Sequence, residues 1–160
     1  MPEIERLLTE LDERVKSGCR VWYFQAHPKT KYRIQNRLKE VNVGDMDVWE
    51  INQHKKEIFK GHIALVWSCG ENAGIYALVD VVSDPKMLVD SEESTKHYVH
   101  EKDKSQKLLR VRIRFRLILD KYITAEELQR KSLQGTNFPV TEPEWSTISK
   151  IIRKKFKEER

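Results

Sequence analysis

The amino-acid sequence predicts a mixed α+β fold in which helices flank a sheet. Three observations carry this prediction: an amphipathic stretch opens the chain, strand-like apolar runs fill its middle, and a second amphipathic stretch closes it. A chain of 160 residues has the length of one domain that buries a sizeable core, so we treat residues 1–160 as a single domain. A hydrophobic content of 39% with 34% charged residues is typical of a soluble globular domain.

The net charge and the number of cysteines indicate what kind of partner and which cellular compartment to expect. The formal net charge of +5 favours an anionic partner. Cys19 and Cys69 are too few for a disulfide framework, which suits a reducing compartment, and we expect a cytoplasmic protein. No apolar run approaches the roughly 20 residues that span a bilayer, and the acidic N-terminus is unlike a signal peptide, so no membrane partner is expected.

The first predicted element is a helix over residues 3–17. Apolar residues recur there at helical spacing, and Gly18 follows as a stop signal. These residues are Ile4, Leu7, Leu8, Leu11 and Val15. We expect one face of this helix to pack on the body of the domain.

The first strand is predicted over residues 20–26, RVWYFQA, because the run is rich in aromatic and β-branched residues. Alternation places Trp22 and Phe24 on one face and Gln25 on the other. Pro28 ends the strand. His27 is either an ordinary turn histidine or, with Gln25, a source of hydrogen bonds at the strand end.

A short strand around Trp49 leads to a central pair of apolar runs. The runs Ile63–Trp67 and Ile75–Val82 fit buried strands, and Ser68–Gly74 joins them. Glycine in such a connection lets the backbone approach a flat ligand closely, but an ordinary hairpin with a core tryptophan fits equally well. Three tryptophans in successive strands, Trp22, Trp49 and Trp67, either converge on a ligand or are buried in the core.

The order of these blocks resembles the EVE domain. The blocks are VWYFQAHPK, then VWEI around Trp49, then GHIALVWSCGENAGIYAL, then QGTNFPVTEPEW near the C-terminus. The resemblance runs from about Val21 to Ile152. It implies a PUA-like curved β-barrel of about five to six strands, flanked by helices and related to the YTH readers of methylated adenine. It also implies a pocket for an extruded, modified base.

The resemblance assigns pocket residues to particular positions of this chain. They are Trp22, Gln25, Ala26, His27, Trp49, Trp67, Ser68, Gly70 and, at the rim, Asn137. Two departures from the family pattern stand out. Family members commonly have Asn where this chain has His27, which alters the hydrogen bonds offered to a base edge. They commonly have Gly-Asp where this chain has Gly61-His62, which alters a turn.

The middle segment, residues 90–106, is dense in charge and is predicted as a long surface loop. His97 and His100 are three residues apart, but two histidines without a third ligand are a weak metal signal. We expect neither a metal nor another cofactor.

The clearest alternation in the chain runs from Leu109 to Leu119 and predicts a strand with one buried face and one arginine face. The arginines are Arg110, Arg112, Arg114 and Arg116. Such a face is either solvated and paired with acidic neighbours or a stripe that tracks phosphates. Together with Lys29 and Lys31, these arginines are our candidate contacts to a nucleic-acid backbone.

Two capping boxes mark helices in the last third of the chain. Thr124 with Glu127 starts a short helix, and Thr141 with Glu144 starts a C-terminal helix predicted over residues 142–157. The apolar stripe of the second helix places Trp145 in the core.

The chain carries no phosphate-binding glycine loop, nucleophile elbow or zinc-type cysteine cluster. We therefore expect no enzyme, but a non-catalytic module that binds nucleic acid carrying a modified, methylated base in an aromatic pocket. A nuclease of a modification-dependent restriction system is a further expected partner. Two alternatives remain open: a PUA-like domain that binds RNA without preferring modified bases, and a small-molecule or thiol site that uses Cys69 and His27.

Overall fold

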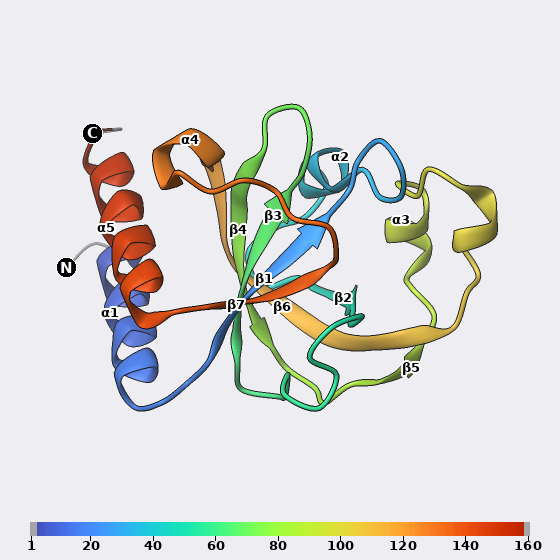
Figure 1. Cartoon of the computed structure of the whole chain (residues 1–160), viewed down its shortest axis with the longest axis horizontal. Helices are drawn as coiled ribbons and strands as arrows, with labels where there is room; N and C mark the ends of the chain where they lie inside the picture. The colour runs from blue at the N-terminus through green and yellow to red at the C-terminus, as the bar shows by residue number, and fades with distance from the viewer. Residues whose placement is uncertain (1–2, 159–160) are drawn as a thin grey trace.

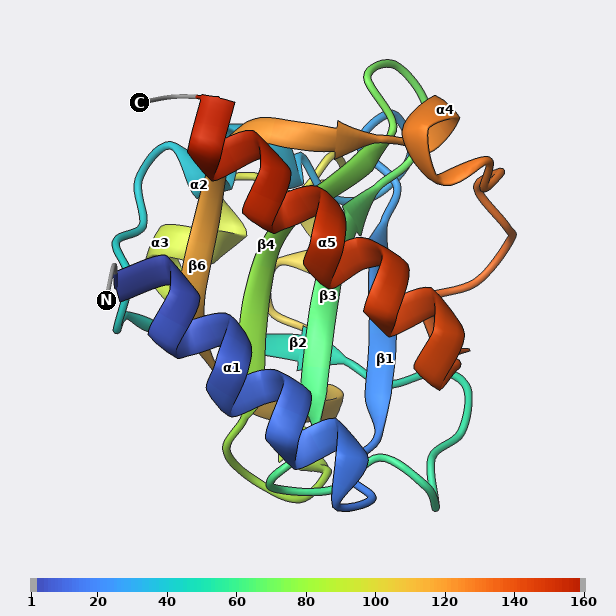
Figure 2. The same ribbon diagram turned by 90° about the vertical axis from the view of Figure 1, so that its left-hand side faces the viewer.

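A seven-stranded sheet covered on one face by the two long helices forms the body of the protein. The computed structural model describes residues 3–158. Figures 1 and 2 show α1 (Glu3–Lys16) and α5 (Glu142–Glu158) lying side by side across one face of the sheet. The predicted mixed α+β class with flanking helices is confirmed, and the arrangement is consistent with a PUA-like fold.

The strands follow the order β2-β6-β4-β3-β1-β7, and β5 pairs with β6. Their bounds are β1 Val21–Ala26, β2 Met46–Glu50, β3 Ile63–Ser68, β4 Gly74–Val81, β5 Lys86–Leu88, β6 Leu108–Thr124 and β7 Asn137–Val140. The short elements are α2 Ile34–Leu38, α3 Glu92–Thr95, the 3₁₀ turn Glu101–Asp103 and α4 Ala125–Leu128.

The sheet is open, whereas a barrel of about five to six strands was predicted. The edge strands β2 and β7 make no ladder with each other in the described part of the chain. The buried side chain of Asn137 connects them instead. It accepts hydrogen bonds from the backbone N–H groups of Asn52 (2.7 Å) and Gln53 (3.2 Å) and donates one to the carbonyl of Glu50 (3.1 Å). The amide oxygen of Gln53 adds to this connection by accepting from the backbone N–H groups of Thr136 (2.8 Å) and Asn137 (3.0 Å).

The strands β1 and β3 are parallel neighbours, and this pairing sets the position of the site. Val21 lies opposite Ile63, and Ala26 lies opposite Ser68, so both strands end at the same edge of the sheet. Every residue of both strands is buried. The predicted strand pair of the central stretch is present as the antiparallel pair β3–β4.

Side chains of β6 pack into two separate cores, whereas the alternation predicted that all its apolar side chains share one buried face. Val111, Ile113 and Phe115 belong to a core on the Trp49 side of the sheet, which we call the pocket-side core. Leu117 and Leu119 belong to the helix-side core beneath α1 and α5. The ladder to β4 shifts register between Leu78 and Val79, whose partners are Leu117 and Phe115. A bulge of one residue reverses the face to which later side chains point, so the same odd-numbered series changes core.

The helices α1 and α5 bind each other through polar as well as apolar contacts. They differ by one residue each from the predicted ranges of 3–17 and 142–157. The indole of Trp145 donates to Asp12 (2.8 Å), and Arg153 pairs with Glu5 (2.7 Å) and Asp12 (2.9 Å). None of the helices in residues 3–158 is long and apolar enough to cross a membrane.

Candidate functional site

The candidate site is a cavity of about 50 Å³ at the carboxyl end of β1. Six segments of the chain contribute to its walls: the end of β1, the turn after it, β2, the segment between β5 and β6, the start of β6, and the loop before β7. The lining residues are Gln25, Ala26, His27, Lys31, Tyr32, Val48, Trp49, Glu50, Asp90, Tyr98, Arg110 and Thr136.

Aromatic rings form one wall of the cavity. Trp49 stacks on Phe24 with ring centroids 5.9 Å apart and planes inclined by 15°. Tyr32 meets Trp49 edge to face at 6.4 Å, and Tyr98 lies 4.9 Å from Tyr32. Because Phe24 and Tyr32 hold the indole on two sides, its position in the wall is fixed before any ligand binds.

The indole N–H of Trp49 is buried and has no hydrogen-bond partner among the described residues. The other three tryptophans each have one. Trp22 donates to His62 Nδ1 (3.1 Å), Trp67 to Ser132 Oγ (3.0 Å) and Trp145 to Asp12 (2.8 Å). A buried donor without a partner costs about 1–3 kcal/mol, and an acceptor that reaches the indole N–H would recover that free energy.

Gln25 lines the cavity, and both N–H groups of its amide bond to the scaffold. Its Nε2 donates to the carbonyls of Leu133 and Gly135, and its Oε1 accepts from Arg130 (3.5 Å). The Arg130 guanidinium lies over the rings of Tyr23 (3.8 Å) and Trp67 (4.3 Å). Gln25 therefore shapes the wall and has no amide N–H left for a ligand.

His27 is bound in a way that fixes its tautomer. Its Nε2 lies 2.8 Å from the carbonyl oxygen of Gly135. A carbonyl oxygen only accepts, so Nε2 carries the hydrogen, and Nδ1 of the neutral ring is an acceptor. The resemblance implied an amide at this position, and this chain has an imidazole whose Nε2 is already bonded to the backbone.

Charged groups lie around the aromatic wall. Lys31 pairs with Glu50 (3.0 Å), and both side chains are part-exposed, so this pair lies at the solvent side of the cavity. Arg110 is only 1% exposed and donates to the carbonyls of Leu88 (2.5 Å) and Gln106 (2.9 Å) and to the Tyr98 hydroxyl (3.2 Å).

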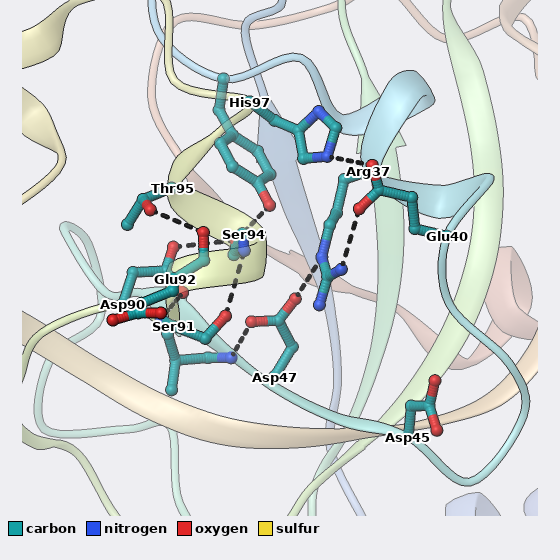
Figure 3. Close-up of polar contacts among 12 residues, drawn as sticks. Arg37, Glu40, Asp45, Asp47, Asp90, Ser91, Glu92, Ser94, Thr95 and His97 are labelled. Atoms are coloured by element: carbon teal, nitrogen blue, oxygen red, sulfur yellow. Dashed lines mark hydrogen bonds and ion pairs between the residues drawn. The ribbon is translucent and has the colours of Figure 1, made fainter.

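A hydrogen-bonded network joins the segment after β5 to α2 and β2 (Figure 3). Arg37 donates to Asp47 (3.1 Å) and to Glu40 (3.5 Å), and Glu40 also contacts His97 Nε2 (3.1 Å). Burial, reinforced by the nearby Asp90 carboxylate, raises the pKa of Asp47 to about 6. His97 is thus part of a polar network, and residues 3–158 contain no group of three potential metal-ligating side chains.

Five residues of the predicted pocket lie outside the cavity lining. Trp22, at the other end of β1, is covered by Arg20 (4.4 Å) and bonded to His62, and Trp67 faces the helix-side core. Ser68 is buried, and its hydroxyl accepts a hydrogen bond from the Gln35 amide (3.0 Å), which connects β3 to α2. The other two are Gly70, on an exposed loop, and Asn137, which connects β7 to β2.

The four arginines of β6 do not form one face. Arg110 is buried beneath the segment that precedes β6, and Arg116 pairs with Glu10 (3.1 Å) and Asp80 (2.6 Å). Only Arg112 and Arg114 are exposed. Lys31 and Arg110, two of the predicted contacts to a nucleic-acid backbone, line the cavity, and Lys29 is exposed on the turn next to it.

Sequence reasoning missed half of the lining. The residues are Tyr32, Val48, Glu50, Asp90, Tyr98 and Thr136. Val48 and Glu50 flank Trp49 and follow from it once the strand is recognised. Tyr32 and Tyr98 meet only through an isolated β-bridge between distant segments, for which the sequence has no local signal.

The alternative thiol site has no support in this geometry. Cys69 lines a different groove from His27, and burial raises the pKa of its thiol. A raised pKa disfavours the thiolate, which is the reactive form.

Comparison with solved structures finds the same fold. Human THYN1 in complex with DNA containing 5-methylcytosine is 14% identical, with a TM-score of 0.57 over 82% of this chain and 96% of that chain. A hypothetical protein from Leishmania major is 18% identical, with a TM-score of 0.54 over 90% and 99%. No curated protein matches the sequence significantly.

The comparison with family models identifies the family, whereas the solved structures show only the fold. The model of the EVE domain matches residues 20–151, which include every strand of the sheet and every residue of the cavity lining. The predicted resemblance is confirmed, and this chain belongs to the EVE domain family.

Proposed function

We propose that this protein is a non-catalytic module that binds nucleic acid and holds a modified, methylated base in the cavity beside Trp49. The observation that carries the proposal is the buried indole N–H without a partner, set in an aromatic wall. The complex of human THYN1 with 5-methylcytosine-containing DNA, a protein of the same fold, supports the choice of ligand.

The aromatic wall supplies the free energy for base extrusion. Unstacking a base costs a few kcal/mol, and stacking on an aromatic side chain returns about 1–3 kcal/mol per base. The Trp49 N–H donates to a ring nitrogen or carbonyl of the base, and His27 Nδ1 accepts from an exocyclic amine. Both groups are held in place by contacts that do not involve the ligand.

The base does not enter without local movement. A cavity of about 50 Å³ holds a few water molecules, because each needs about 10–15 Å³ of such volume. Lys31 and Glu50 pair at the solvent side of the cavity, and exposed pairs of this kind contribute at most about 1 kcal/mol. Opening this pair is the least costly way to admit a base.

The test is fluorescence anisotropy with labelled oligonucleotides, DNA and RNA, that carry 5-methylcytosine, 5-hydroxymethylcytosine or N6-methyladenine, against unmodified controls. The wild type is expected to prefer one modified oligonucleotide. Trp49→Phe, which keeps a ring but removes the N–H, should weaken that binding roughly fivefold to thirtyfold, since a lost hydrogen bond costs about 1–2 kcal/mol.

Trp22→Phe is the matched control, because Trp22 is also a buried tryptophan of the sheet but lies outside the cavity. It should bind like the wild type. Equal, weak binding of all oligonucleotides that Trp49→Phe leaves unchanged would contradict the proposal. Steep salt dependence without preference for a modified base would instead support the alternative of a plain RNA-binding domain.

A further inference from the structure

A second, polar groove of about 220 Å³ lies next to the cavity. Its walls come from the turn after β1, from α2 and from the loop after β3. Since β1 and β3 are parallel and end together, these two loops meet at one edge of the sheet. The lining residues are Pro28, Lys29, Arg33, Gln35, Asn36, Cys69, Glu71 and Asn72.

One tight turn separates the groove from the cavity. The carbonyl of His27 accepts from the backbone N–H groups of Thr30 (3.3 Å), Lys31 (2.9 Å) and Tyr32 (3.1 Å), which makes the turn rigid. Lys31 and Tyr32 line the cavity, whereas Lys29 lines the groove. Lys29 and Lys31 are two residues apart, and two residues of chain span at most about 7 Å, so the groove begins within that distance of the cavity. The backbone of a polymer whose base occupies the cavity therefore passes this turn.

The groove presents positive charge that the protein does not neutralise. Lys29 and Arg33 are exposed, and neither has a carboxylate of the described residues within 4.0 Å. Arg33 Nη1 donates to the carbonyl of Tyr98 (3.3 Å), which positions the guanidinium and leaves other donors for a ligand. Glu71 is the one acidic residue of the lining, so the formal charge of the groove remains positive.

The exposed arginines of β6 are a rival surface for the same ligand. Arg114 lies opposite Asp80 of β4, whereas the groove residue Asn72 precedes Gly74 at the other end of that strand. Six residues of strand correspond to roughly 20 Å. This distance separates Arg114 from the groove, whereas Arg112 lies opposite Val48, which lines the cavity, so Arg112 is the nearer rival. The side chains opposite the two arginines in β2 are Val48 and Met46, which are apolar and offer a phosphate no hydrogen-bond donor.

We propose that the phosphates flanking the bound base lie in the groove beside the turn and contact Lys29 and Arg33, not the arginines of β6. This inference rests on the proposed function, because the cavity defines where the base lies. The amide side chains of Asn36 and Asn72 supply further hydrogen-bond donors along the same path.

Two double variants with the same loss of charge test this path. Lys29→Gln with Arg33→Gln is compared with Arg112→Gln with Arg114→Gln by measuring the affinity for a single-stranded oligonucleotide at several salt concentrations. The groove variant should bind roughly tenfold or more weakly at low salt. Its slope of log K against log salt should fall by about 0.7 for each lost phosphate contact. The β6 variant should keep the wild-type slope.

Arg33→Gln also removes the hydrogen bond to Tyr98 and could disturb that segment, so Lys29→Gln is measured alone as a control. The single variant should show about half of the slope change of the double variant. A slope change in the β6 variant with none in the groove variant overturns the inference. An unchanged preference for the modified oligonucleotide in the groove variant, together with the reduced slope, supports it. If the wild type has no preference for a modified oligonucleotide, the proposed function is wrong. The salt slopes of the two double variants still show which arginines and lysines contact the phosphates.

Discussion

At the scale of single residues, Asp47 gives the protein a pH dependence of known sign. Its pKa of about 6 lies above the value of 3.8 of a free carboxyl, mainly because it is buried. Between these two pH values the folded protein binds a proton that the unfolded chain has lost. Asp47 therefore lowers the free energy of unfolding as the pH rises from 4 to 7.

Asp47→Asn removes this contribution. Relative to the wild type, the free energy of unfolding of the variant should rise from pH 4 to pH 7, by an amount on the order of 2–3 kcal/mol for a shift of about two pKa units. Urea denaturation of both proteins at several pH values measures it. A difference that falls with pH would mean that the ion pair with Arg37 outweighs the effect of burial.

The tryptophans show how far single residues can be interpreted from sequence. Trp49 was a candidate for the pocket together with Trp22 and Trp67, and nothing in their local sequences separates them. The difference lies in partners from elsewhere in the chain: His62 for Trp22 and Ser132 for Trp67, with none for Trp49. Similarly, His27 was recognised from the sequence, but its tautomer depends on Gly135.

At the scale of elements, Arg110 holds the segment between β5 and β6 against the cavity. This segment was predicted as a polar loop, and it contains α3 and a 3₁₀ turn. Arg110 donates to Leu88, near its start, to Gln106, at its end, and to Tyr98 between them. One buried guanidinium thus connects three points of a segment that has few apolar side chains of its own.

Arg110→Met should loosen this segment, because methionine fills much of the space but donates no hydrogen bonds. Trypsin should then cleave after Lys102 or Lys104 several times faster than in the wild type, as followed by mass spectrometry. Arg112→Met is the control, since Arg112 is exposed, and it should be cleaved at the wild-type rate. Equal rates for both variants would show that Arg110 does not hold the segment.

Strand β6 shows what an alternating pattern determines and what it leaves open. The alternation correctly predicted a strand, since a period of two has no other regular interpretation. It did not predict the bulge near Arg116, because a bulge arises from the register with β4 and leaves no trace in the alternation itself.

At the scale of the whole molecule, the sheet joins two cores that share their strands. Residues of β1, β3, β4 and β6 contribute to both the helix-side and the pocket-side core. We therefore predict that the two cores unfold together as one domain.

Leu11→Ala removes contacts from the helix-side core, and Ile58→Ala removes them from the pocket-side core. Each should lower the free energy of unfolding by about 2–5 kcal/mol. Circular dichroism and tryptophan fluorescence should give coincident transitions for both variants. Separate transitions in either variant would mean that the cores are independent units.

The sequence by itself determined the mixed α+β class, the main helices and strands and the family, and it made Trp49 and His27 candidates for the site, because periodicity, caps and ordered motifs are local properties. Tertiary structure alone decided which indole lacks a partner, which arginines are exposed, and that Tyr32, Asp90, Tyr98 and Arg110 meet in one cavity. Those outcomes depend on the parallel pairing of β1 with β3 and on segments folded over the sheet edge. Contacts between distant segments form only when the whole chain packs, so no short stretch of sequence encodes them.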